Sequence, residues 1–251
     1  MTQTVDVPGG GYRYIPGVFQ YSAGVGALDG FQIERVTLQT PLPLAEGFTF
    51  IERYLTEQGV PHLGFCACEL RSPAPFSEAG FIAFNRHYCG TLERWGVMTG
   101  EDNPVARSNV CPEVDKPTEP SFHAFCFARP MPGASGSFVI AGSGEAEEGH
   151  ASYRERTVRF GDTSPAGLRE KGIFVLNRME QRMAPLSATW SDTTAAQVYT
   201  VFDLHPFLQD EIARRGAIQH GLTWHLARPP VQGLDYEMDC RSIPVERCVR
   251  L

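Results

Sequence analysis

The sequence lacks the long apolar segments and the basic clusters that mark membrane proteins and nucleic-acid-binding proteins. No stretch approaches the roughly 20 apolar residues that span a bilayer. Residues 1–17 show no basic segment followed by an apolar core, so we expect no secretory signal. The formal net charge is −7 without any run of Lys and Arg, so we expect neither nucleic acid nor membrane as a partner. An anionic ligand would need a local arginine instead.

The cysteines also fail to form a recognisable framework. There are seven, an odd number, and several lie in apolar strand-like runs, where a thiol behaves as a small hydrophobic group. We therefore expect a reducing, cytoplasmic setting without disulfides. Cys66 and Cys68 share one strand face, but no second pair with zinc spacing follows. The sequence thus predicts no metal and no cofactor.

What is present is an order of predicted elements that occurs twice in 251 residues. The first half predicts strands at 18–22, 31–38, 62–70, 107–111 and 122–128, with helices at 44–55 and 77–96. After the Pro- and Gly-rich residues 130–136, the second half predicts strands at 137–142, 156–160, 195–202, 222–226 and 236–240, with helices at 164–183 and 206–216. The fold class is α+β, with the order β-β-α-β-α-β occurring twice in tandem. Each unit is a mixed sheet with its helices on one face. We expect the other face to be buried against a further unit, in a homo-oligomer.

The segment Pro104-Val105-Ala106-Arg107-Ser108-Asn109-Val110 carries the strongest functional signal. It places Arg107 at the start of a short strand, after a turn-rich run. An arginine there, partly exposed in a cleft, can grip a carboxylate with two hydrogen bonds. The alternative is a solvated arginine at a strand edge.

This segment resembles, with one extra residue, the proline-alanine-arginine-serine motif of the Rid (YjgF) family of enamine and imine deaminases. Asn85 and Tyr88 match an asparagine and a tyrosine of that family, and share a helix face. Ser22 matches a serine that closes the family's first long strand. The resemblance extends over two units, 12–129 and 136–248. It implies that both are chorismate-mutase-like, that the protein forms trimers with active sites between subunits, and that Arg107 binds the carboxylate. It implies that Ser22, Asn85 and Tyr88 orient water or substrate. The alternative is packing for Ser22 and Tyr88, and capping or bridging a loop for Asn85.

The two halves depart from the family pattern in different ways. The family's catalytic glutamate is replaced by His123 in the first half, whereas Glu237 occupies that position in the second. The second half lacks the arginine, the serine and the asparagine–tyrosine pair. Glu237 and His123 are therefore both candidates for the acid/base. Glu237 either acts across an interface or belongs to a scaffold, and His123 either acts or packs.

The resemblance implies a metal-independent hydrolytic deaminase that releases ammonia from an enamine or imine carboxylate. Two-unit chains of this size are similar to deaminases of 2-aminomuconate-type intermediates in aromatic-ring degradation. The alternative is a protein that binds a small carboxylate or a partner without turnover, because the acid/base pattern is broken. Whether Glu237 lies near Arg107 discriminates the two, since a proton-transferring group must lie within one water of the reacting carbon.

Overall fold

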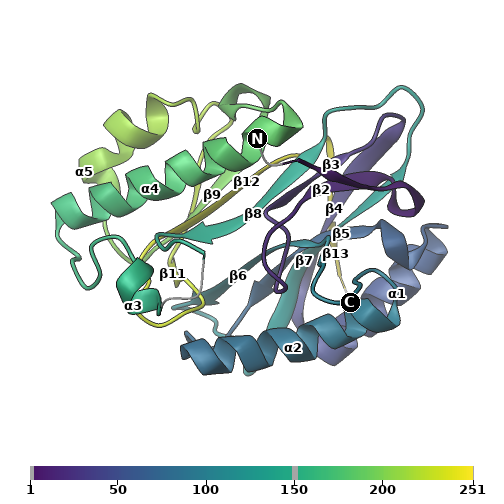
Figure 1. Ribbon diagram of the computed structural model, residues 1–251, viewed down its shortest axis with the longest axis horizontal. Helices are drawn as coiled ribbons and strands as arrows, with labels where there is room; N and C mark the ends of the chain where they lie inside the picture. Colours follow the sequence, from purple (N-terminus) through teal and green to yellow (C-terminus); the bar gives the residue numbers. More distant parts are fainter. Residues whose placement is uncertain (1–2, 149–151, 251) are drawn as a thin grey trace.

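Two β-sheets packed face to face, with helices on their outer faces, make up the computed structural model, which describes residues 3–148 and 152–250 (Figure 1). One sheet has the strand order β11-β6-β5-β7-β4-β13, and the other has the order β1-β2-β3-β8-β12-β9-β10. Both sheets contain parallel and antiparallel pairs. The predicted α+β class is confirmed.

The six-stranded sheet is formed by β4 (Phe31–Pro43), β5 (Phe65–Arg71), β6 (Ala106–Pro112), β7 (Ser121–Pro130), β11 (Ala227–Arg228) and β13 (Val245–Val249). Helices α1 (Leu44–Glu57) and α2 (Glu78–Arg94) cover its outer face. Phe48 of α1 packs on Tyr88 of α2 and on Phe122 of β7. The hydroxyl oxygen of Ser77 accepts the backbone N–H of Gly80 at 3.1 Å and so begins α2 where the sequence predicts it.

The seven-stranded sheet is formed by β1 (Val5–Val7), β2 (Tyr12–Ile15), β3 (Gly24–Ala27), β8 (Phe138–Gly144), β9 (Ala195–Tyr199), β10 (Thr223–His225) and β12 (Glu237–Ser242). Helix α4 (Pro165–Met183) packs on β8 and β12 through Val175, Leu176 and Met179. Ser164 caps α4, as predicted. The shorter helix predicted at 206–216 forms as α5 (His205–Phe207), followed by a π-helical turn (Leu208–Ala213).

The strand predicted at 156–160 is wrong. A capping box between Ser152 and Glu155 begins a helical turn instead, α3 (Tyr153–Arg156). Positive φ angles at Arg159 (48°) and Gly161 (75°) then bend the chain into a turn. The second half therefore does not repeat the predicted β-β-α-β-α-β order.

The strand predicted at 18–22 is also wrong, and the sheets do not follow the halves of the sequence. Residues 18–22 form a tight turn closed by Val18 and Tyr21. The strands β1 to β3 join the sheet of the second half, where β3 pairs with β8. Conversely, two strands of the second half join the six-stranded sheet, where β13 runs parallel to β4 and β11 pairs with β6. The predicted units 12–129 and 136–248 thus exchange strands, and each sheet combines strands from both halves of the sequence.

Small side chains allow the inner faces of the two sheets to approach each other. Ala67, Ala106 and Ala141 meet there, together with Tyr12 and Val25. The face opposite the helices is therefore covered within a single chain, and the oligomer expected from an open face stays a prediction. No helix in the two described ranges is long and apolar enough to cross a membrane. All seven thiols are free, and six are buried.

Candidate functional site

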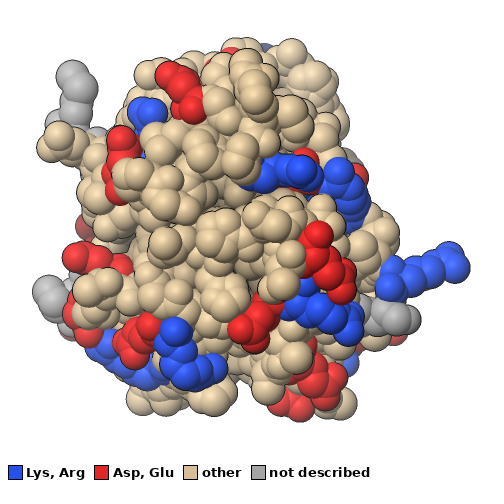
Figure 2. Space-filling model, turned by 90° about the vertical axis from the view of Figure 1, so that its right-hand side faces the viewer, with Lys and Arg blue, Asp and Glu red and all other residues tan. Residues whose placement is uncertain are grey.

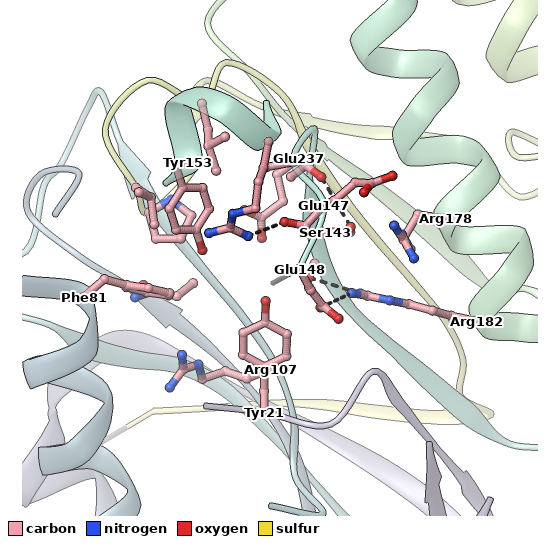
Figure 3. A pocket seen from close by; sticks show the side chains of 18 residues that line it. Tyr21, Phe81, Arg107, Ser143, Glu147, Glu148, Tyr153, Arg178, Arg182 and Glu237 are labelled. Carbon is pink, nitrogen blue, oxygen red and sulfur yellow. Dashed lines mark hydrogen bonds and ion pairs between the residues drawn. The ribbon is translucent and has the colours of Figure 1, made fainter. Parts of the chain in front are cut away.

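A cavity lies at one end of the contact between the two sheets (Figure 3). Its walls come from β6, β8, β12, α4 and the loops at residues 145–148 and 230–234. The empty volume is about 580 Å³, open solvent at the mouth included. Arg107 and Glu237 both line this cavity. The fold thus brings together an arginine of the first half and a glutamate of the second.

Arg107 is 3% exposed, so the expectation of a partly exposed side chain is wrong. Three aromatic rings surround its guanidinium, with centroids 4.7 Å (Tyr88), 5.6 Å (Phe84) and 5.7 Å (Tyr21) from Cζ. Nη2 donates a hydrogen bond to Oδ1 of Asn85. Nη1 is buried without a partner, and no carboxylate in the described ranges pairs with this guanidinium. A buried charged donor without an acceptor is costly, and a bound carboxylate would satisfy it.

The other residues of the predicted first-half site position Arg107 rather than line the cavity. Asn85 donates to the carbonyl of Phe81 at 2.6 Å, which fixes its oxygen toward Arg107. The hydroxyl of Tyr88 lies 3.3 Å from Sγ of Cys68, so this residue presents its ring to Arg107 rather than its oxygen.

Ser22 holds the chain before β6. Its hydroxyl donates to the carbonyl of Pro104 at 3.1 Å, and its backbone N–H donates to Val105. It does not line the cavity. Its neighbour Tyr21 does, and Figure 3 shows the hydroxyls of Tyr21 and Tyr153 directed toward the interior. These two hydroxyls can hold a water molecule, and sequence reasoning missed both.

Asn109 is a second buried donor in the cavity wall that sequence reasoning missed. It follows Arg107 by two residues on β6, so both side chains lie on the same face of the sheet. Its Oδ1 accepts a hydrogen bond from Ser72 at 2.9 Å, whereas its Nδ2 is buried without an acceptor. Two buried donors in the cavity wall, Nη1 of Arg107 and Nδ2 of Asn109, therefore lack an acceptor. The period of two along a strand was the signal that could have found this residue.

Glu237 begins β12 and is 4% exposed. Burial raises the pKa of its carboxyl well above the ordinary value, and the nearby carboxylates of Asp239 and Glu145 add to this rise. The carboxyl lies against Gly142 of β8, where a Cβ would approach Oε1 to 2.2 Å. Glycine therefore leaves the space that this carboxyl occupies. A carboxyl that keeps its proton to higher pH is suited to act as a general acid.

His123 lies outside the cavity, on β7. Burial and, to a lesser extent, the positive charge of Arg71 lower its pKa to about 3. The structure therefore places one of the two acid/base candidates, Glu237, in the wall of the cavity that Arg107 also lines, and leaves the other outside it.

Helix α4 adds positive charge to the cavity. Arg182 donates to the carbonyls of Ala141 and Gly142 at 2.9 and 3.2 Å and pairs with Glu148 at 2.9 Å. Arg178 also lines the cavity, one helical turn earlier. On the outer face that Figure 2 shows, by contrast, Lys and Arg lie interspersed with Asp and Glu. The local arginines that an anion needs are inside the cavity.

Within residues 3–148 and 152–250, no group of three or more His, Cys, Asp or Glu is placed to hold a metal ion. Cys66 packs in the core between the two sheets, whereas Cys68 packs in the core under α1 and α2, against Tyr88, so the expectation that they share a strand face is wrong. Burial raises the pKa of both thiols.

Comparison with known proteins gives two matches. The model of a family described as "2-aminomuconate deaminase CnbZ" matches residues 4–247. A protein of Comamonas testosteroni named 2-amino-5-chloromuconate deaminase is 53% identical over 235 residues, which cover 93% of this chain and 94% of that protein.

Proposed function

This chain belongs to the 2-aminomuconate deaminase family CnbZ, and we propose that it hydrolyses 2-aminomuconate or a close analogue to the corresponding 2-oxo acid and ammonia. One observation supports the proposal most. The buried, unpartnered Nη1 of Arg107 and the carboxyl of Glu237 line one cavity. The residues that we assign as carboxylate clamp and proton-transferring group thus line the same cavity, which supports the proposal.

In the proposed reaction, Arg107 and Asn109 bind the carboxylate next to the amino-bearing carbon. The acid form of Glu237 protonates the neighbouring enamine carbon, which converts the enamine into an iminium. Water, held by Tyr21 and Tyr153, adds to the iminium carbon and gives one proton to the carboxylate of Glu237. In the tetrahedral intermediate the hydroxyl proton passes to the amino group, so the C–N bond breaks, ammonia leaves and a carbonyl group remains. One water is consumed and one ammonia is released, without a metal, as expected for a hydrolase of the Rid type.

Ammonia release from freshly prepared 2-aminomuconate tests the proposal. Glu237→Gln keeps the shape of the side chain but cannot exchange a proton, so we expect a fall in kcat of about 10²- to 10⁴-fold. Arg107→Lys keeps the charge but loses the planar guanidinium that donates two parallel hydrogen bonds to a carboxylate. We therefore expect a fall in kcat/KM of roughly 10-fold or more. The matched control is Arg214→Lys, because Arg214 forms only an exposed ion pair with Asp210.

Full activity in the Glu237→Gln variant would refute the assignment of the acid. Binding of the substrate by the unaltered protein without ammonia release would refute the deaminase proposal and favour a carboxylate-binding protein. We also propose the homo-oligomer, favoured as a trimer, which sedimentation of the purified protein tests.

A further inference from the structure

The cavity holds more positive charge than one carboxylate requires. The following four arginines line it: Arg107, Arg156, Arg178 and Arg182. Two glutamates at its rim, Glu147 and Glu148, oppose them. Burial keeps the third, Glu237, in its acid form to higher pH. Four arginines thus line a cavity that has two glutamates at its rim, an arrangement that attracts an anionic ligand.

These arginines differ in what they already bind. Arg182 is engaged by two backbone carbonyls and by Glu148. Arg156 donates to the carbonyl of Glu147 and lies over the ring of Tyr153, 4.4 Å from its centroid.

Arg178, by contrast, is half-buried and has no hydrogen bond or ion pair in the described parts of the chain. Its guanidinium only flanks the ring of Phe174, at 5.5 Å. It therefore remains available to a ligand.

Arg107 and Arg178 come from different walls of the cavity. Arg107 lies on β6 of the six-stranded sheet, whereas Arg178 lies on α4, which covers the other sheet. Figure 3 shows Tyr21 and Glu148 between them. Two guanidinium groups on separate walls are arranged for a ligand with an acid group at each end.

We propose that Arg178 binds the second carboxylate of a dicarboxylic enamine, while Arg107 binds the carboxylate beside the reacting carbon. The inference rests on the proposed deaminase function and adds the determinant of its substrate class. Arg178 thereby selects dicarboxylates over enamines that carry a single carboxylate.

Binding of two unreactive six-carbon dienes, measured by calorimetry, tests this role without turnover. Muconate carries a carboxylate at both ends, and sorbate carries one. Calorimetry gives the preference for muconate over sorbate in the unaltered protein, in Arg178→Gln, and in Arg214→Gln as the matched control for loss of one charge. We expect the preference to fall by roughly 10- to 100-fold in Arg178→Gln, since one charged hydrogen-bonding contact is lost. The control keeps the full preference.

An unchanged muconate preference in Arg178→Gln would overturn the assignment, even if 2-aminomuconate is deaminated normally. Ammonia release from a one-carboxylate enamine, 2-aminocrotonate, is the second readout. It should be unaffected by Arg178→Gln, and a parallel loss on both substrates would also overturn the assignment by indicating a general structural role. Failure of the deaminase proposal itself looks different, because the unaltered protein then releases no ammonia from either substrate.

Discussion

Substitution of Gly142 by alanine is expected to damage catalysis while sparing the fold. A Cβ at this position would lie 2.2 Å from Oε1 of Glu237 and 3.1 Å from Oγ of Ser108. Ordinary contacts begin at 3.4 Å, so the carboxyl must retreat by about 1 Å. A misplacement of about 1 Å can cost about 10²-fold in rate, so we expect kcat for ammonia release to fall by about that factor.

The folded state should tolerate the same substitution. Gly142 does not have a positive φ, so alanine fits the backbone. The nearest atom is the end of a flexible side chain, and loss of backbone freedom in the unfolded chain contributes about 0.5–1 kcal/mol in favour of alanine. We therefore expect the free energy of unfolding, from urea denaturation, to change by less than about 1 kcal/mol.

Gly90→Ala is the matched control. Gly90 lies in α2, and no atom lies within 4 Å of the position that a Cβ would occupy there, so alanine should stabilise the helix by about 1 kcal/mol without changing kcat. A Gly142→Ala variant with unaltered kcat would refute the position or the role assigned to the Glu237 carboxyl. A rise in KM alone would indicate that the methyl group obstructs the ligand instead.

Three further outcomes are expected. Because the folded protein keeps a proton on Glu237 that the unfolded chain loses above about pH 4.3, the unfolding free energy should fall as pH rises from there to the raised pKa. Denaturation across pH 5–9 checks this, and Glu237→Gln should flatten the curve. His123→Gln is a control only above about pH 7, because this histidine titrates near pH 6.5 in the unfolded chain and at about 3 in the folded protein. Asn85→Asp places a carboxylate beside Arg107, so KM should rise at least about 10-fold while kcat changes less; an unchanged KM would contradict the clamp. Lys171→Met leaves two carboxylate partners of a fully buried lysine without a cation, so urea denaturation should report a loss of about 3–5 kcal/mol; a loss below about 1 kcal/mol would contradict that reasoning.

The elements defined by local patterns could be predicted from the sequence. The apolar residues Leu44, Phe48, Ile51 and Leu55 recur at helical spacing and form the buried side of α1. Serine caps locate the starts of α2 and α4. The error at 156–160 arose where a short apolar pattern competed with a capping box, which determined the local structure.

The pairing of strands could not be predicted, because the partners lie far apart in the chain. Val245 pairs with Glu34, and Gly24 pairs with Ile140. No local periodicity contains that information, since periodicity shows which face of a strand is buried but not what lies beside it.

Prediction of the site was limited for the same reason. The motif identified Arg107, but its burial depends on Tyr21 and Tyr88, which other elements bring to it. Glu237 could be proposed from the resemblance, while its contact with Gly142 appears only in three dimensions. Arg178 carries no local signal, because one arginine on an amphipathic helix resembles any other until the cavity is formed.

The exchange of strands also sets the order in which the cavity can be completed during synthesis. Chains emerge from the ribosome N-terminus first, and early segments begin to fold as they appear. Arg107, the proposed carboxylate clamp on β6, is made early, but Glu237, the proposed proton donor, lies on β12, and the six-stranded sheet receives its edge strand β13 only from residues 245–249. A nascent chain halted shortly before β12 therefore has the arginine but not the acid. On the proposed mechanism, reactivity toward an enamine therefore arises only when synthesis is almost finished.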